Sequence, residues 1–168
     1  MKNGKDCFPL TVLDDYSRFS LCLDAKENER REGVTESFLR LFDTYGLPES
    51  ILCDNGNPWG TSRTMGFTTF EVWLLDYDIL PIHGRIFHPQ TQGKEERFHR
   101  TLVAELLKHI DIDNLEDAQM HFDQFRSCYN YERPHEALKM GVPSEFYRPS
   151  RRLRPETVRR WGYPDGFQ

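Results

Sequence analysis

Alternating apolar and polar residues over 8–23 predict two β-strands joined by a polar turn. Apolar residues at three-to-four spacing then predict a helix over 34–45, with Thr35 as its cap and Gly46 as its stop signal. The apolar run 51–53 is too short for a helix and predicts a strand. A short apolar strand beside a helix is typical of parallel sheets, so the pattern predicts an α/β fold.

The second half of the chain continues this alternation. The segment 57–67, rich in Gly, Ser and Thr, predicts a loop, and 70–82 predict a second helix followed by a short strand. The clearest helical pattern covers 93–110, and a further helix begins after its predicted cap, Asn114. Proline and glycine interrupt residues 132–150, which we expect to form an extended tail around the core.

Composition limits the class of protein. A chain of 168 residues with 38% hydrophobic, 29% charged and 13% aromatic residues is typical of one ordered domain. No apolar run resembles a membrane span or a signal peptide. The net charge of −5 does not exclude nucleic acid, because the distribution of charge matters more than its sum.

Basic residues concentrate near the C-terminus, with six arginines and one acid between Arg148 and Arg160. This stretch is either a solvated tail or a segment that contacts phosphates. We therefore divide the chain into a core, 1–147, and a basic tail, 148–168.

Several other side chains receive a structural interpretation. The four cysteines do not have the spacing of a metal site and are expected to be buried, reduced thiols: Cys7, Cys22, Cys53 and Cys128. Histidines for which the sequence shows no partner are His83, His109 and His121. Trp59 and Trp73 are interpreted as core aromatics rather than base-stacking platforms. Polar anchors that tie the tail to the core are expected at Asn130, Arg133, Pro134 and His135.

Asp54 stands where a carboxylate can hold a metal ion. It directly follows the predicted strand 51–53, and functional groups gather at the carboxyl ends of strands in open α/β sheets. The same residue also suits the start of an Asp-Asn-Gly turn, so local sequence leaves both interpretations open.

Two more acids, Glu95 and Glu96, open the helix predicted over 93–110, where they also stabilise the helix dipole. Glu96 precedes His99 and Arg100 by three and four positions and so shares their side of the helix. A carboxylate beside basic residues fits a metal and phosphate site.

A long motif, HPQTQGKEERFHRTL at 88–102, combines with PLTVLDDYSR at 9–18, LCDNG at 52–56 and YNYERPHEAL at 129–138. In this order the segments resemble the DDE transposases and retroviral integrases, in particular the bacterial insertion-sequence transposases. The resemblance implies an RNase H-like mixed sheet flanked by helices.

The resemblance also implies catalytic residues. Asp54 matches the second metal-binding acid of the family, and Glu96 matches the third. The first acid is expected on a central strand upstream of Met1, because Asp14 and Asp15 match non-catalytic positions. We therefore expect a chain that lacks this strand, has two unpaired strand edges and shows little activity alone.

The expected cofactor is Mg²⁺ or Mn²⁺ at a two-metal site, since hard oxygen ligands suit these ions. The expected partners are DNA, both element ends and target, and further copies of the chain, without a membrane, in the bacterial cytoplasm at the nucleoid. DNA contacts are expected from Gln92, Lys94, Arg97, His99 and Arg100.

Two other functions remain open at this point. The chain could be a non-catalytic DNA-binding or assembly fragment of a decayed transposase. It could also be a different RNase H-like nuclease, such as a ribonuclease H or a resolvase, although the motif at 88–102 argues against this.

Overall fold

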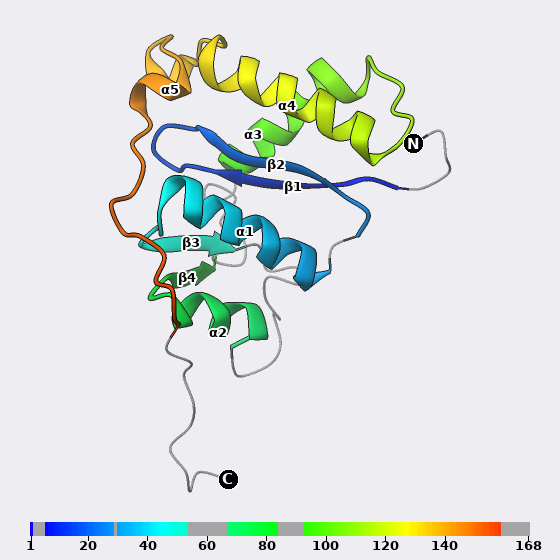
Figure 1. Cartoon of the computed structure of the whole chain (residues 1–168). Helices are drawn as coiled ribbons and strands as arrows, with labels where there is room; N and C mark the ends of the chain where they lie inside the picture. Colours follow the sequence, from blue (N-terminus) through cyan, green and yellow to red (C-terminus); the bar gives the residue numbers. More distant parts are fainter. Residues whose placement is uncertain (2–5, 29, 54–66, 84–92, 159–168) are drawn as a thin grey trace, which may run out of the picture. The chain divides into compact units, whose positions relative to one another are not determined.

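The chain folds into two units that each combine helices and strands, as drawn in Figure 1. The computed structural model describes residues 1, 6–28, 30–53, 67–83 and 93–158. The first unit contains Met1–Ser37 and Pro89–Arg148, and the second contains Phe38–His88 and Pro149–Gln168. Helix α1, Arg31–Tyr45, contributes to both.

The first unit is built on a hairpin. Strand β1, Phe8–Leu13, pairs antiparallel with β2, Ser20–Lys26. In the turn between them, the Asp14 carboxylate accepts hydrogen bonds from the amide and hydroxyl of Ser17, at 2.7 and 2.6 Å. Arg18 takes the left-handed conformation, with φ of 65°, that reverses the chain. The predicted strand pair around a polar turn is confirmed.

The long helical pattern after Gly93 is also confirmed, with one difference. Helix α3, Gly93–Leu102, continues into a π-helical turn, η2, Val103–Leu107. Helix α4, Leu115–Tyr131, begins at its predicted cap, Asn114, whose side chain accepts the amide of Asp117 at 3.0 Å. The buried residues that join these helices to the hairpin are Leu23, Phe98, Leu102, Phe122 and Tyr129.

Polar side chains of α4 cover the outer edge of β2. Asn130 accepts the Ser20 amide at 2.7 Å and donates to the Ser20 carbonyl at 3.0 Å. Arg126 donates to the Leu21 carbonyl at 3.0 Å. Gln119 donates to the Leu23 carbonyl at 3.1 Å and accepts the Ala25 amide at 2.8 Å. Helix side chains thus take the place of a neighbouring strand and satisfy an edge that would otherwise be exposed.

The segment 132–150 was predicted to be an extended tail, and the structure differs. It contains a short 3₁₀ turn, η3, Glu136–Leu138, and a short helix, α5, Pro143–Phe146. Between η3 and α5, Lys139 and Met140 both take the left-handed backbone conformation. Pro143, in the first turn of α5, has a fixed φ that favours the start of a helix. A proline that was interpreted as a break in the sequence, Pro143, therefore begins a short helix.

Of the predicted anchors in this region, Asn130 bonds β2, and Arg133 forms an ion pair with Glu105. The His135 ring lies edge-on to Tyr129, with centroids 4.7 Å apart. Its Nε2 atom is buried and has no hydrogen-bond partner among the described residues.

The second unit contains a parallel pair of strands. Strand β3, Ser50–Cys53, pairs with β4, Leu80–His83, and α2, Thr69–Asp76, lies between them in the chain. This confirms the predicted strand–helix–strand pattern. Within the described residues, the antiparallel and parallel pairs form two separate sheets.

Aromatic side chains hold α1 and α2 together in the second unit. Trp73 stacks on Phe42 and Phe70, with ring centroids 5.7 and 5.5 Å apart, and Phe38 and Tyr77 extend the cluster. Trp73 is therefore a core aromatic, as predicted, while Trp59 lies outside the described residues.

The ends of α1 differ in how well the sequence predicts them. Thr35 is not the cap, because α1 begins at Arg31 and the Thr35 hydroxyl donates to the Arg31 carbonyl at 3.0 Å. Gly46 does end the helix: its φ is 79°, and its amide donates to the Phe42 carbonyl at 3.0 Å. A Cβ atom at Gly46 would lie 2.5 Å from the Ser150 carbonyl oxygen, so the close approach of this segment also requires glycine.

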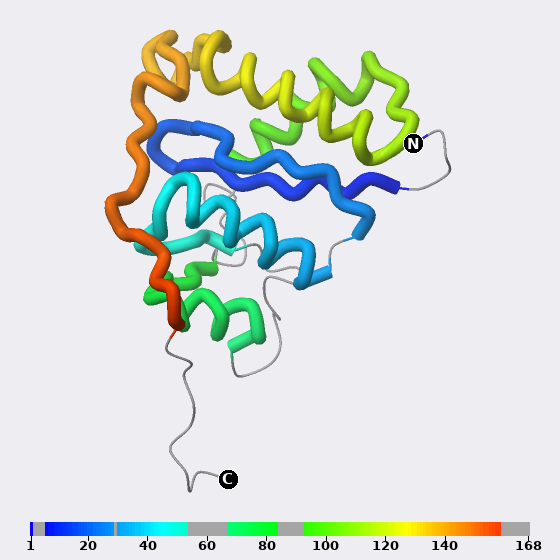
Figure 2. Tube along the Cα trace, viewed as in Figure 1, coloured from blue at the N-terminus to red at the C-terminus, as the bar shows by residue number. Residues whose placement is uncertain are grey.

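Arginines near the C-terminus bind other parts of the second unit, to which they belong. Figure 2 shows the red segment after residue 148 running beside α1 and α2. The Arg152 guanidinium donates to the carbonyls of Pro48 and Asp78, at 2.7 and 2.9 Å. Arg154 holds both carboxylate oxygens of Asp43, at 2.6 and 2.9 Å. Arg152 and Arg154 therefore contact other protein groups and are not only solvated. The division of the chain into a core, 1–147, and a tail, 148–168, stays a prediction.

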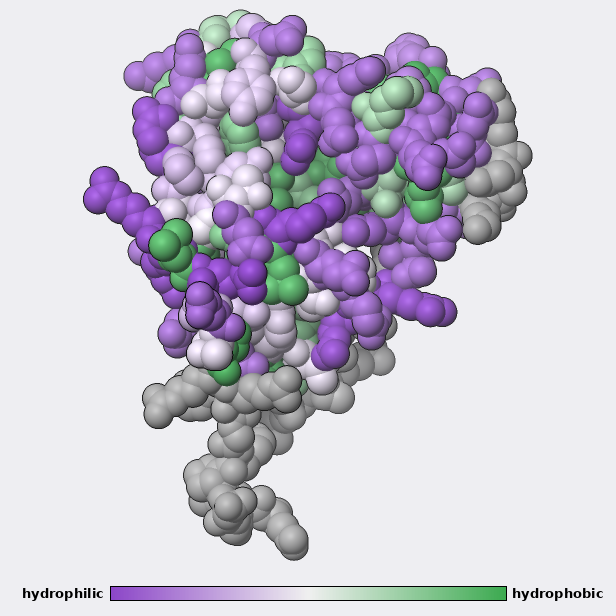
Figure 3. All heavy atoms as spheres, viewed as in Figure 1, coloured by the Kyte–Doolittle hydropathy of each residue, from purple (hydrophilic) through white to green (hydrophobic). Residues whose placement is uncertain are grey.

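The surface is polar over most of the face seen in Figure 3, where apolar side chains form small, separate green patches. Across the part of the chain that the structure describes, no helix is long and apolar enough to cross a membrane.

The Asn130 anchor predicts a large loss of stability on substitution. Asn130→Ala leaves the buried amide and carbonyl of Ser20 unsatisfied, which should lower the free energy of unfolding by about 2–4 kcal/mol. Urea denaturation measures this change. Gln124→Ala, at an exposed position of the same helix, should change stability by less than about 0.5 kcal/mol. Equal stabilities of the two variants would contradict the anchor role.

His135 predicts a loss of stability in mild acid. Burial holds the pKa of His135 below its ordinary value of 6.5, so the unfolded chain binds the proton more readily than the folded chain. Its contribution to stability is complete above about pH 6.5 and declines as the pH falls toward the folded pKa. Urea midpoints measured from about pH 7.5 to about pH 5.5 should fall less in His135→Phe, which keeps a ring on Tyr129. Parallel pH profiles for both proteins would refute this.

Candidate active site

The first turn of α3 carries the acids that the sequence singles out. Glu95 and Glu96 lie in this turn, and His99 and Arg100 lie in the last, so the charges match the helix dipole at both ends. Phe98 and the residues that follow it on the same stripe bury the opposite side in the first unit. The helix is thereby fixed with its acidic end at the surface.

Thr11 of β1 holds one side of this turn. The Thr11 hydroxyl donates to Glu95 Oε1 at 2.7 Å and lies 2.8 Å from His99 Nε2. Glu95 and His99 are four residues apart and share a face of the helix, so one hydroxyl contacts both. Lys94 adds a second link, because its ammonium group donates to the carbonyl of Asp15 at 3.0 Å and to its carboxylate at 2.5 Å.

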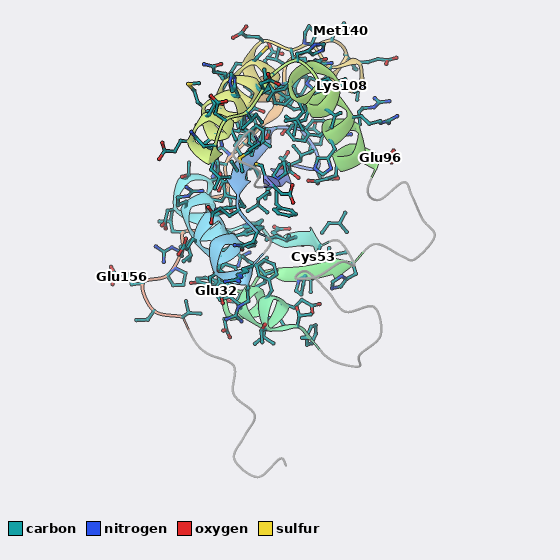
Figure 4. All side chains as sticks on the ribbon, turned by 90° about the vertical axis from the view of Figure 1, so that its right-hand side faces the viewer. Glu32, Cys53, Glu96, Lys108, Met140 and Glu156 are labelled. Carbon is teal, nitrogen blue, oxygen red and sulfur yellow. The ribbon has the colours of Figure 1, made fainter. Side chains whose placement is uncertain are left out.

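Glu96 faces a different direction. Its side chain is 66% exposed, and the guanidinium of Arg100 lies 3.9 Å from one carboxylate oxygen. Figure 4 shows Glu96 at the first turn of α3, pointing outward. Consecutive residues of an α-helix differ by about 100° around its axis, so the contact that holds Glu95 on β1 turns Glu96 away from it. An exposed carboxylate in this position can bind a hard cation.

The predicted DNA contacts divide into three groups. Arg97 and Arg100 are exposed on α3 beside Glu96. Lys94, which is partly exposed, bonds Asp15, and His99, which is exposed, contacts Thr11. Gln92 lies outside the described residues, as does Asp54, the other predicted metal ligand.

The carboxyl edge of the β3–β4 sheet is the second place that the sequence predicted to be functional. Cys53 and His83, the last residues of the two strands, are in register. Cys53 is buried, and burial, assisted by the negative charge of Glu71, raises the pKa of its thiol to about 12. This thiol stays neutral near pH 7, which makes it a poor metal ligand.

Glu71 and His83 form a pair that the sequence analysis missed. His83 Nε2 lies 2.6 Å from Glu71 Oε1, so the prediction that His83 lacks a partner is wrong. Burial raises the pKa of Glu71, but hydrogen bonds from Thr68 and His83 outweigh it and leave the pKa below its ordinary value. The available signal was Thr68-x-x-Glu71, a capping-box spacing, although nothing local points to His83.

The other two histidines also have partners. His109 Nε2 lies 2.9 Å from the Ala104 carbonyl oxygen, and His121 Nε2 lies 3.5 Å from an Asp117 carboxylate oxygen. Each contact joins residues four or five positions apart, which a helical turn brings close together.

No group of three or more His, Cys, Asp or Glu side chains in the described ranges could hold a metal ion. Asp54, the other predicted ligand, lies outside those ranges. Glu96 itself suits a hard cation, because it offers exposed carboxylate oxygens and the Arg100 guanidinium lies as far as 3.9 Å from the nearer one.

Comparison with known proteins bears on these residues directly. Residues 77–143, which include α3 and α4, match the model of the integrase core domain family. Over this segment the chain is similar to integrase core domains. This confirms the resemblance to transposases and retroviral integrases that the motif at 88–102 predicted.

Curated relatives of this chain include insertion-element proteins and a viral polyprotein. A protein of insertion element IS136 from Agrobacterium fabrum is 27% identical over 154 residues, covering 87% of this chain and 76% of the relative. An IS407 protein from Burkholderia multivorans is 25% identical over 146 residues, covering 87% of this chain but 50% of the relative. The Gag-Pro-Pol polyprotein of sheep pulmonary adenomatosis virus is 32% identical over 96 residues, covering 57% of this chain and 5% of the polyprotein.

Solved structures show the fold. The catalytic core domain of BIV integrase superposes with a TM-score of 0.64 at 20% identity, covering 84% of this chain and 85% of that one. A chain in the simian T-cell lymphotropic virus intasome, solved in complex with PP2A regulatory subunit B56 gamma, gives 0.64 at 16% identity and covers 90% and 56%. The chain therefore has the predicted α/β, RNase H-like fold.

The burial of the cysteines predicts their order of reactivity. All four are free thiols, but Cys128 is exposed, contrary to the expectation that all are buried. In the folded protein, Cys128 should react with a thiol reagent such as DTNB much faster than the buried Cys22 and Cys53. Cys128→Ser should remove the fast phase, and full reaction should require denaturant. Rapid labelling of Cys53 in the folded chain would contradict the burial described here.

Proposed function

We propose that this chain is an integrase-type core that supports metal-dependent cleavage and strand transfer of DNA during transposition, with Asp54 and Glu96 as metal-binding carboxylates. The observation that carries the proposal is the different treatment of two adjacent acids. Glu95 is held by Thr11, whereas Glu96 is exposed at the start of α3 inside the matched integrase segment. Glu96 is also the acid that matches the family motif.

Divalent cations, Mg²⁺ or Mn²⁺, would be held by Glu96 and Asp54. When bound, they supply the positive charge that activates an attacking oxygen and stabilises a leaving one during phosphoryl transfer. Glu96 contributes its oxygens from a helix whose orientation is fixed by Thr11 and Lys94. A ligand presented on a supported helix keeps its geometry better than one on an unsupported loop.

DNA is the proposed substrate and partner. Arg97 and Arg100 are exposed on the helix that carries Glu96, and arginines in this position suit phosphate oxygens. Gln92, Lys94 and His99 are the other proposed contacts. The insertion-element relatives and the intasome neighbour support action on DNA within a multimer, and the bacterial relatives support a place at the nucleoid.

Activity of the 168-residue chain by itself should be low, because the family uses three carboxylates and two are assigned here. The non-catalytic alternative, a DNA-binding or assembly fragment, shares this expectation. The two proposals differ when the chain is expressed together with any in-frame coding sequence that precedes Met1 in its element. Activity should then arise only under the catalytic proposal.

Substitution of the two adjacent acids, in the protein extended by the preceding coding sequence, tests the assignment. Glu96→Gln should reduce Mn²⁺-dependent cleavage of DNA carrying the element's ends to background, because an amide is a poor ligand for a hard cation. Glu95→Gln is the matched control: its amide oxygen can still accept the Thr11 hydroxyl, so most activity should remain. Asp54→Asn should behave like Glu96→Gln. Gel-shift measurements should show DNA binding preserved in all three variants.

Two outcomes would overturn the assignment. Cleavage by Glu96→Gln at the level of the unsubstituted protein would exclude Glu96 as a ligand. Loss of cleavage in Glu95→Gln with retention in Glu96→Gln would exchange the roles of the two acids. DNA binding without cleavage in the extended, unsubstituted protein would favour the non-catalytic alternative.

A further inference from the structure

The turn between β1 and β2 displays an aromatic ring that the packing of the first unit does not use. Tyr16 is 75% exposed, the largest exposed fraction of any aromatic residue in the described ranges. Within those ranges its ring has no aromatic neighbour, and its hydroxyl has no hydrogen bond. An exposed tyrosine is not unusual by itself, so the support and the surroundings of this one decide what it can do.

Hydrogen bonds on both sides of Tyr16 fix the backbone that carries it. The Asp14 carboxylate accepts the amide and the hydroxyl of Ser17, and the Asp14 carbonyl accepts the Arg18 amide at 2.9 Å. The Arg18 guanidinium donates to the carbonyls of Asp15 and Tyr16. A ring on a backbone that is already ordered loses little conformational entropy when it binds a partner, which suits it to act as a contact.

The same turn is bonded to the helix of the candidate active site. Lys94, in the first turn of α3, donates to the carbonyl and the carboxylate of Asp15, at 3.0 and 2.5 Å. Tyr16 directly follows Asp15, and Glu96 follows Lys94 by two positions. The exposed ring and the exposed carboxylate therefore belong to two segments of the first unit that direct bonds hold together.

The charges of the turn favour a contact with a base over a contact with phosphates. The carboxylate of Asp14 is bonded by Ser17, and that of Asp15 is bonded by Lys94. Two acids thus offset the positive charges of Arg18 and Lys94, so the turn itself attracts phosphates weakly. What it offers is the face of a ring, and an aromatic face stacks on a base that is not already covered by its neighbours in a duplex.

We propose that Tyr16 stacks on an unpaired DNA base beside the candidate active site. The inference rests on the proposed function, in which Arg97 and Arg100 of α3 bind the phosphates of the DNA. Cleavage and transfer of strands create strand ends, where a base leaves the duplex at lower cost than in its interior. Tyr16 takes no part in the chemical step, and its role is to hold such a base.

Binding of single-stranded DNA to the full chain tests the proposal without an assay of cleavage. The probe is a fluorescein-labelled strand of mixed sequence and about 12 nucleotides, and the same strand annealed to its complement is the duplex probe. Fluorescence anisotropy gives both dissociation constants. Tyr16→Leu keeps an apolar side chain but removes the aromatic face, so it should weaken binding of the single strand by about tenfold and of the duplex by less than about twofold. Tyr16→Phe keeps the ring and should bind the single strand within about twofold of the unsubstituted chain.

The matched control is Phe8→Leu, which removes an aromatic ring at the other end of β1. Phe8 is 37% exposed and begins the strand, whereas the turn that carries Tyr16 follows the last residue of the strand, Leu13. This variant should bind both probes as tightly as the unsubstituted chain. Urea denaturation identifies conditions in which every variant is folded. Should Tyr16→Leu be unfolded in them, Tyr16→Ser is titrated in its place, since serine suits a turn.

A double variant, Arg97→Ala with Arg100→Ala, separates this inference from the proposed function. Under the proposed function it should weaken binding of both probes, because phosphate contacts occur on single strands and duplexes alike. Weakening by the double variant, with no change in Tyr16→Leu, would leave the DNA contacts of α3 standing and overturn the stacking role. Weaker single-strand binding in Tyr16→Leu alone would support stacking and contradict the arginine contacts.

Three further outcomes would overturn the inference. Equal weakening in Tyr16→Leu and Tyr16→Phe would assign the effect to the hydroxyl rather than to the ring. Equal weakening of the two probes by Tyr16→Leu would show that the contact does not depend on an unpaired base. Binding of neither probe by the unsubstituted chain would contradict both this inference and the proposed DNA contacts, and would favour a protein as the partner of the exposed ring.

Discussion

The hydrogen bonds from α4 to the outer edge of β2 are the constraint on which the first unit depends. An isolated two-stranded hairpin is marginal in water, and each strand offers unpaired backbone groups on its outer side. Asn130, Arg126 and Gln119 satisfy those of β2. Because each bond requires a particular helix residue opposite a particular strand residue, the contacts fix the register of α4 along the hairpin. Apolar packing, which is less directional, could not do this alone.

A hairpin fixed in this way can orient α3. Thr11 lies on β1 and contacts both Glu95 and His99, while Lys94 reaches the turn at Asp15. The direction of Glu96 follows from these contacts and from helix geometry, without any bond of its own to the hairpin. Two adjacent acids therefore have different surroundings. Glu95 helps to fix the helix on β1, and Glu96 is exposed to solvent.

The sequence predicted those features that depend on neighbouring residues. The hairpin, the Asn114 cap and the Gly46 stop all follow from local chemistry, and all are present. Thr35 shows the limit of such reasoning, because a residue type that caps helices also occurs inside them. The contacts of Arg152 and His83 depend on segments far away in the chain, and no local pattern distinguishes them from solvated side chains. Asp54 carries part of the resemblance to the family but lies outside the described residues.

Three glutamates near helix starts show why residue type and position do not determine a role. Glu71, Glu95 and Glu96 all lie in the first turn of a helix, where each stabilises the dipole. Glu71 is buried and satisfied by an amide and an imidazole, which suits it to hold backbone elements together. Glu95 accepts a hydroxyl from β1, and Glu96 is mostly exposed beside Arg100. A divalent cation must displace whatever a carboxylate already binds, so affinity for metal should increase from Glu71 to Glu95 to Glu96. The surroundings of each acid, rather than its place in a motif, therefore provide the physical reason to assign the chemistry to Glu96.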